Sequence, residues 1–182
     1  MEYVITPVRS WYSFRYGVES PTQLAEGIAR CGYAGGILSD AGVVTGQLEY
    51  AAACRGNGII GAAGVELTIK GIRVLFAALE GGWGNLCGLI TSATVPDRIS
   101  TEESLPLCMN VAAIVVNASE AKILEHEMDF SGQLFVSVFP ECISGRSPEI
   151  VEHEILEQGY HPIASWPLSL IHISEPTRLL SI

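Results

Sequence analysis

Residues 20–38 read SPTQLAEGIARCGYAGGIL, a pattern typical of an amphipathic helix followed by a short strand. Ser20 and the proline after it are typical of a helix start, because serine accepts a bond from a free N–H and proline fits the first turn. Gly32 marks the helix end. The apolar run 34–38 and the earlier run 3–8 predict strands on either side. The opening of the chain therefore predicts a strand–helix–strand unit of the parallel kind.

The same alternation continues along the chain. Further helices are predicted over 46–55, 84–92, 119–128 and 147–158. Strands are predicted at 59–60, 65–69, 72–78, 111–116, 134–139 and 161–164, with Lys70-Gly71 as a two-residue hairpin turn. Strand followed by helix at this spacing favours parallel βα units, in either an open doubly wound sheet or a barrel. One domain is expected over residues 1–167.

Charge and composition restrict the partners. The 182 residues carry a formal net charge of −10, and their cations are scattered among acids, so we expect little direct nucleic-acid contact and a protein partner instead. There is no apolar run of the about 18 residues that a membrane span needs, and no secretory signal, which favours the cytoplasm. The cysteines are expected to be reduced, mostly buried thiols. They are Cys31, Cys54, Cys87, Cys108 and Cys142.

The last residues have an unusual sequence. Residues 168–178, LSLIHISEPTR, resemble the translation of a sequencing adapter. We therefore expect residues 168–182 to be a non-native tail, and His172 receives no functional weight. The native protein is then expected to continue beyond Pro167, which would leave the fold incomplete at its C-terminus.

Three successive predicted strands end in charged residues. Arg9 follows the first, Asp40 the second, and Glu66 lies near the third. Parallel α/β folds place their sites at the C-terminal ends of strands, so a cation and two carboxylates are expected to meet there.

An ordered series of motifs surrounds these residues. It comprises Arg9-Ser-Trp-Tyr-Ser13, Leu38-Ser-Asp-Ala-Gly42, Gly46-Gln-Leu-Glu-Tyr50, Gly64-Val-Glu-Leu67, Leu75-Phe-Ala77, Gly84-Asn-Leu-Cys-Gly-Leu89 and Pro162-Ile-Ala-Ser165. In this order the series resembles the polymerase-and-histidinol-phosphatase (PHP) domain at the start of bacterial DNA polymerase III alpha-type subunits. The Asn-Leu-Cys segment resembles the polymerases more than stand-alone PHP phosphatases. The resemblance implies a PHP-type distorted (βα)7 barrel in the α/β class.

The resemblance also implies a cluster of divalent metals held largely by histidines, and here the chain departs from it. Pro7, Arg9, Ala41 and Ile72 stand where the family has histidines, so only Asp40 and Glu66 remain at ligand positions. Three of the replacements donate nothing to a metal, and the guanidinium places a fixed positive charge where a dication would sit. We therefore expect no metal, no other cofactor and no catalytic residue in this chain.

Arg9 is expected to pair with Asp40 or Glu66 in place of the metals. The competing interpretation is that Asp40 caps the following turn and Arg9 points to solvent. The expected function is a structural or docking domain of a DNA-directed DNA polymerase that takes part in replication or repair. Its partners would be the rest of that polymerase chain and a proofreading or other replisome subunit. The alternatives are an active Zn- or Mn-dependent phosphoesterase or 3′–5′ proofreading exonuclease, and a barrel unrelated to replication.

Two further groups receive simpler interpretations. Glu149, His153 and Glu157 share one helix face, and a second acidic cluster spans 125–129; both are expected to be solvated surface. Four aromatic residues follow the first strand, and packing in the core is favoured for them over a docking patch. They are Trp11, Tyr12, Phe14 and Tyr16.

Overall fold

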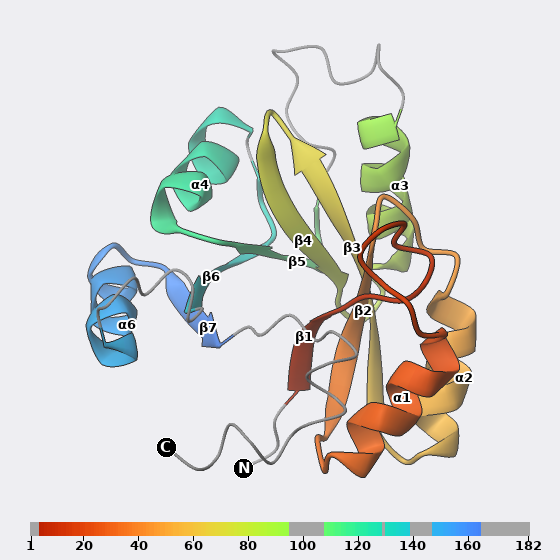
Figure 1. Cartoon of the computed structure of the whole chain (residues 1–182). Coiled ribbons are helices and arrows are strands. Elements are labelled where there is room, and N and C mark those ends of the chain that lie inside the picture. Colours follow the sequence, from red (N-terminus) through yellow and green to blue (C-terminus); the bar gives the residue numbers. More distant parts are fainter. Residues whose placement is uncertain (1–3, 95–107, 129, 139–146, 165–182) are drawn as a thin grey trace. The chain divides into compact units, whose positions relative to one another are not determined.

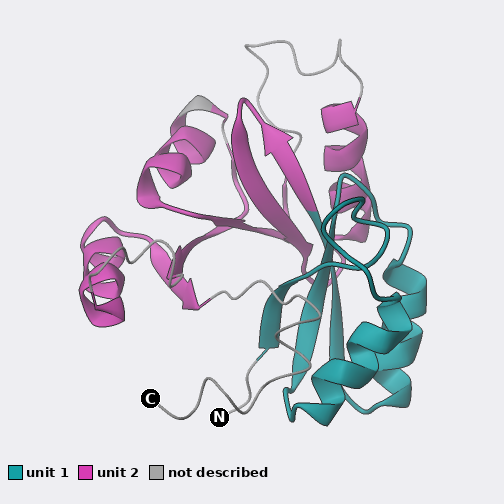
Figure 2. Ribbon diagram, in the orientation of Figure 1, with its two compact units in different colours: residues 1–65, 166–182 teal, residues 66–165 magenta. Residues whose placement is uncertain are grey.

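The computed structural model describes residues 4–94, 108–128, 130–138 and 147–164. The chain forms two compact units, one of residues 1–65 with 166–182 and one of residues 66–165 (Figure 2). The tail predicted to be non-native lies outside the described residues, and so does Cys142. The predicted extent of the domain, residues 1–167, stays a prediction.

Unit 1 contains the first strand–helix repeats of the chain. Its elements are β1 (Val4–Val8), α1 (Pro21–Arg30), β2 (Gly35–Ala41), α2 (Gln47–Gly56) and the first part of β3 (Ile60–Ile69), all of which can be followed in Figure 1. The expected strands and helices are confirmed in this order. The strands predicted separately at 59–60 and 65–69 are one continuous strand, β3.

The α1 helix begins as its sequence predicts. Ser20 accepts a hydrogen bond from the backbone N–H of Gln23, and the Gln23 side chain accepts one from the backbone N–H of Ser20. This reciprocal pair satisfies two N–H groups that a helix start otherwise leaves open. The buried face of α1 carries Leu24 and Ile28, which pack in one apolar cluster with β1, β2 and α2.

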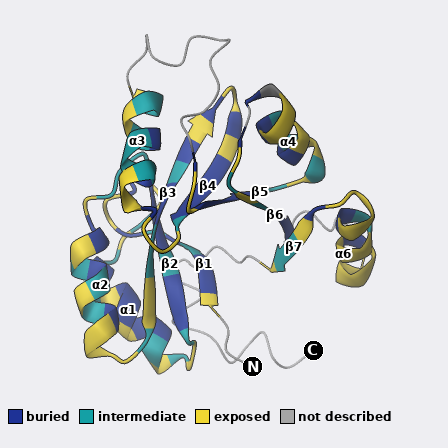
Figure 3. Cartoon of the chain, turned by 180° about the vertical axis from the view of Figure 1, so that it is seen from behind, coloured by how far each residue is buried: buried dark blue, intermediate teal, exposed yellow. Residues whose placement is uncertain are grey.

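Unit 2 contains the rest of β3 and the remaining elements. They are β4 (Ile72–Ala78), α3 (Trp83–Thr94), β5 (Val111–Val115), α4 (Ala118–Lys122), the π-helical turn η1 (Ile123–Glu127), β6 (Gln133–Val138), α6 (Pro148–Glu157) and β7 (His161–Ala164). The helix predicted over 119–128 is thus an α-helical turn that continues as a π-helix. Figure 3 shows buried residues along the strands, and all five residues of β5 are buried.

The seven strands form one sheet in sequence order, β1 to β7. The β1–β2, β5–β6 and β6–β7 pairs are parallel, as the strand–helix alternation predicts. The β4–β5 pair is antiparallel although helix α3 lies between the two strands, which departs from the parallel unit expected where a helix follows a strand. The two-residue turn Lys70-Gly71 joins β3 to β4, whereas the chain from β4 to β5 passes through α3.

The described part of the chain contains no helix that is long and apolar enough to cross a membrane. This is consistent with the absence of a long apolar run in the sequence.

Candidate functional site

Asp40 is the centre of a buried polar cluster in unit 1. It lies near the end of β2, its side chain is fully buried, and both carboxylate oxygens accept hydrogen bonds. Oδ1 accepts from the backbone N–H of Ser10 at 2.7 Å and from the hydroxyl of Ser13 at 2.6 Å. Oδ2 accepts from the Ser10 hydroxyl at 2.7 Å. Three donors therefore compensate the burial of this carboxylate.

The two serines belong to the loop between β1 and α1, and the cluster holds that loop in place. The Ser13 hydroxyl also accepts from the backbone N–H of Ala41, so one side chain joins the loop to both the carboxylate and the backbone of β2. Backbone bonds from Trp11 N–H to Glu19 O and from Gly17 N–H to Ser13 O close the loop on itself. A Cβ at Gly17 would lie 1.9 Å from the Ser10 carbonyl oxygen, so this close approach requires glycine.

Gln47 makes a second buried polar contact near Asp40. Its side-chain amide donates to the carbonyl of Leu38 in β2 at 2.9 Å and to the carbonyl of Gly64 in β3 at 2.8 Å. The start of α2 is thereby fastened to two neighbouring strands. Sequence reasoning assigned no role to Gln47, Ser10 or Ser13, and only their near-complete burial distinguishes them from surface polar residues.

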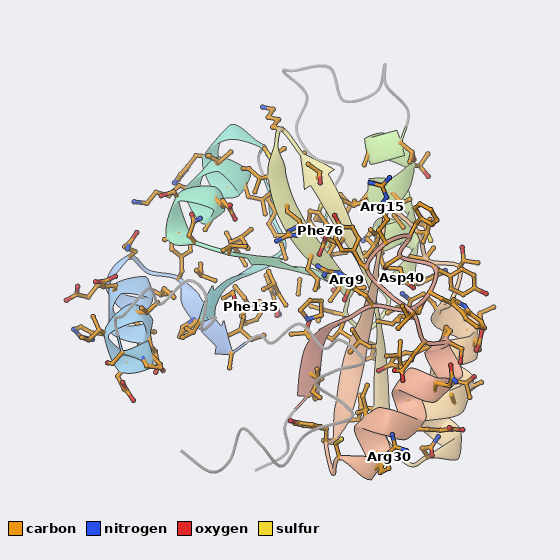
Figure 4. All side chains as sticks on the ribbon, in the orientation of Figure 1. Arg9, Arg15, Arg30, Asp40, Phe76 and Phe135 are labelled. Carbon is orange, nitrogen blue, oxygen red and sulfur yellow. The ribbon has the colours of Figure 1, made fainter. Side chains whose placement is uncertain are left out.

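Arg9 follows β1 directly and is half-buried, with its guanidinium carbon 5.5 Å from the centre of the Tyr16 ring. Its pairing with Asp40 or Glu66 stays a prediction. Glu66 lies inside β3 and not at the strand end, and its Oε1 is 3.9 Å from Nε of Arg73 on β4. Figure 4 labels Arg9 and Asp40 among the side chains of the chain.

The positions expected to have lost their ligands are held by side chains without donor atoms for a metal. Pro7 lies in β1, Ala41 ends β2, and Ile72 begins β4. Nowhere among the described residues do three or more His, Cys, Asp or Glu side chains come together as a group able to hold a metal ion. Both Asp40 oxygens accept bonds from serines, and the loss of the metal cluster that the sequence resemblance implies stays a prediction.

The described side chains of the two clusters interpreted as solvated surface are exposed. His153 and Glu157 are 3.3 Å apart with both side chains mostly exposed, and Glu149 on the same helix is exposed. A hydrogen bond from the Ser147 side chain lowers the pKa of Glu149. In the second cluster Glu125 and His126 are exposed, while the side chain of residue 127 and residue 129 lie outside the described part.

The aromatic residues after β1 do not pack in the core, and that expectation was wrong. Trp11 is 50% exposed, Tyr12 38%, Phe14 83% and Tyr16 63%. The hydroxyls of Ser10, just before them, and of Ser13, between Tyr12 and Phe14, donate to Asp40 instead. The loop therefore directs its two serines inward, while its rings and Arg15 are exposed.

The four described cysteines are present as thiols. Cys54 and Cys108 are buried, whereas Cys31 and Cys87 are partly exposed. Burial raises the pKa of Cys108 to about 11 and also raises that of Cys54.

The sequence matches no family model, and no curated protein matches it. Solved structures do match it. One is an amidohydrolase from Chromobacterium violaceum, solved with bound sulfate and no metal, at a TM-score of 0.60 and 12% identity over 92% of this chain and 88% of that one. Another is described as a metal-dependent phosphoesterase from Bifidobacterium adolescentis, at a TM-score of 0.56 and 10% identity over 89% of this chain and 85% of that one.

These likenesses establish the fold. The chain is a mixed α/β protein with a seven-stranded sheet of the kind found in PHP-like amidohydrolases and phosphoesterases. At 10–12% identity they carry no statement about activity.

Proposed function

We propose that this chain is a PHP-like domain whose metal site is degenerate and which serves as a structural and docking domain. We further propose that it belongs to a DNA polymerase III alpha-type subunit that acts in cytoplasmic DNA replication or repair. Its partners would then be the rest of the polymerase chain and a proofreading or other replisome subunit. The polymerase part rests on the ordered motif series, and the fold of the matched structures is compatible with it.

The proposal of a degenerate metal site rests mainly on the burial and hydrogen bonding of the Asp40 carboxylate. Metal-dependent phosphoester hydrolysis needs several ligands that polarise the phosphate and ionise a water through the metal. The carboxylate here is fully buried and accepts three hydrogen bonds from Ser10 and Ser13, so three of its about four lone pairs are used by the loop. Such a carboxylate supports the backbone around it.

Metal analysis of the purified protein tests this proposal. We expect less than stoichiometric zinc and manganese after dialysis, and no release of phosphate or nucleotide when Mn²⁺ is added to p-nitrophenyl phosphate or a 3′-labelled oligonucleotide. Asp40→Asn serves as the control. Hydrolysis by a metal site of this protein should be lost in the variant, whereas hydrolysis by a contaminating enzyme should remain.

The second candidate is an active metal-dependent phosphoesterase, which is favoured by the likeness to the amidohydrolase and phosphoesterase structures. Stoichiometric metal together with hydrolysis that Asp40→Asn removes would establish it and overturn the degenerate site. The polymerase parentage has a separate test. The gene should continue downstream of this chain with paired catalytic aspartates, and a stop soon after residue 167 would contradict it.

A further inference from the structure

We propose that the cavity between η1 and the first residues of β6 and β7 binds a small planar organic carboxylate. The residues that line it all belong to unit 2, and the nearby elements α4, β6 and β7 are labelled in Figure 1. The proposal goes beyond the proposed function, because binding here requires neither a metal site nor a polymerase parent.

The cavity is large enough for a small organic molecule. Its volume is about 840 Å³, within the range of about 300–1,000 Å³ that is usual for small-molecule sites. Its lining residues come from three segments, namely 122–126 at the junction of α4 and η1, 132–135 at the start of β6, and 158–161 at the start of β7. Sequence reasoning looked for a site at the ends of strands, whereas this cavity lies where two strands begin.

One part of the cavity wall consists of aromatic rings. Phe135 of β6 and His161 of β7 are direct partners in the parallel register, and their ring centres lie 6.1 Å apart with the planes inclined at 46°. Phe135 is half-buried and His161 is exposed, and both line the cavity. Neighbouring rings of this kind offer faces and edges against which a further flat ring can pack. This favours a planar ligand over a branched aliphatic one.

The helical segment contributes most of the charged groups. Lys122 and His126 are four positions apart and line the cavity together with Glu125. The Oε2 atom of Glu125 accepts a hydrogen bond from the Tyr160 hydroxyl at 3.1 Å and lies 3.8 Å from Nε2 of His126. Among the described lining residues, one ammonium group and two imidazoles thus accompany a single carboxylate that already has partners. The ammonium group can donate a charge-assisted hydrogen bond to a second carboxylate, which favours an organic anion as the ligand.

The cavity keeps its shape through contacts within unit 2. Tyr160 is buried, and its bond to Glu125 joins the segment before β7 to η1. A Cβ at Gly132 would lie 2.4 Å from the Val111 carbonyl oxygen, so the chain can enter β6 along this path only with glycine. The turn η1 is π-helical, a form that is rare and often found at functional sites. A site formed in advance loses little conformational entropy when a ligand binds.

The test is a titration of 2-naphthoate with the full chain, followed by the line widths of the ligand in proton NMR spectra. For a ligand of about 13 non-hydrogen atoms, ordinary binding efficiency per atom gives a dissociation constant of about 1 mM. Lys122→Gln should weaken binding about fivefold, because the charge-assisted hydrogen bond is lost. Lys122→Arg, which keeps the positive charge, should bind about as well as the unchanged chain.

Phe135→Leu tests the ring wall, since it removes the ring but keeps an apolar side chain. It should weaken binding about fivefold. Circular dichroism verifies that the variants fold. Lys122 is exposed, so Lys122→Gln remains informative even if Phe135→Leu does not fold.

Matched controls lie elsewhere in unit 2. Lys70→Gln changes the other lysine of the chain, and Trp83→Leu removes an exposed ring on α3; both should leave binding unchanged. Two ligand controls, 2-naphthalenemethanol without the charge and cyclohexanecarboxylate without the flat ring, should each bind more weakly than 2-naphthoate.

Three results would overturn the proposal. They are no binding at about 10 mM 2-naphthoate, ten times the expected dissociation constant, unchanged affinity of Lys122→Gln, and an equal loss of affinity in Lys70→Gln. The titration needs no added metal, so its outcome and that of the metal analysis are independent.

Discussion

Asp40 illustrates how one residue can be identified from sequence while its role is decided by its neighbours. The sequence singled it out as a remaining ligand position beside Arg9. In the structure its three donors come from Ser10 and Ser13, two small polar residues that sequence reasoning left without a role. We propose that a carboxylate so enclosed contributes mainly to stability.

Asp40→Ala should lower the free energy of unfolding by about 3 kcal/mol or more, because it leaves an N–H and two hydroxyls buried without their acceptor. Urea unfolding followed by circular dichroism measures the loss. Glu49→Ala is the control, since Glu49 accepts from Thr22 at a partly exposed site and its removal should cost about 1 kcal/mol or less. Equal decreases in the free energy of unfolding of the two variants would show that the buried cluster stabilises the fold no more than the partly exposed Glu49–Thr22 contact.

Arg9→Ala should lower the free energy of unfolding by about 1–2 kcal/mol if the guanidinium pairs with a carboxylate and rests on Tyr16. Arg9→Lys should recover only part of this, because an ammonium group lacks the planar fork. Unchanged stability of Arg9→Ala in urea would discard the pairing.

The thiols should differ in reactivity. With its pKa raised to about 11, Cys108 should have only about one thiolate in a thousand molecules at pH 8, and it is also buried. Iodoacetamide at pH 8 should therefore label Cys31 and Cys87 first, as read by peptide mass spectrometry. In about 8 M urea, where the chain is unfolded, the labelling rates of the cysteines should become similar. Labelling of Cys108 as fast as Cys31 in the folded protein would contradict its burial.

At the scale of elements, the turn between β3 and β4 reverses the direction of the chain from one strand to the next. Lys70 and Gly71 have φ angles of 48° and 81°, both left-handed, as a two-residue hairpin turn of this kind requires. The Lys-Gly pair could be recognised in the sequence because glycine is the residue that adopts such angles without cost.

Gly71→Ala should destabilise the chain by about 1 kcal/mol through this backbone angle alone, since the space around its Cβ position is open. Gly56 is a matched control. It also has open space around its Cβ position but ends the α2 helix, where alanine should stabilise by up to about 1 kcal/mol. Thermal unfolding of the two variants should shift in opposite directions, and a shift in the same direction would refute the argument.

At the scale of the whole molecule, charge governs the behaviour in solution. The sequence isoelectric point is about 4.8 and the net charge at pH 7 is −10. As the pH rises from 4.8 to 7, carboxylates ionise and molecules repel one another more strongly. Light scattering should therefore be highest near pH 4.8 and fall toward pH 7, and added salt at pH 7 should reduce the difference. Maximal scattering at pH 7 would indicate that exposed apolar surface outweighs charge.

The sequence alone determined the order and type of nearly every described element, because short-range patterns fix them. Ser20 and its proline start α1, the apolar runs mark the strands, and Lys70-Gly71 marks the hairpin. These signals lie within a few residues of each other, so no knowledge of distant contacts is needed. The likeness to PHP-like folds could also be inferred from the order of the motifs.

Only the tertiary structure decided which side chains meet. Ser10 and Asp40 are thirty positions apart, and whether they or other groups share a hydrogen bond depends on the register of β1 against β2. The same holds for the rings of residues 11–16, which are exposed while Ser13 between them donates to the buried carboxylate. A buried charge must be hydrogen-bonded by groups that lie close to it in space. Which groups lie close depends on the complete fold and cannot be inferred from their positions in the sequence.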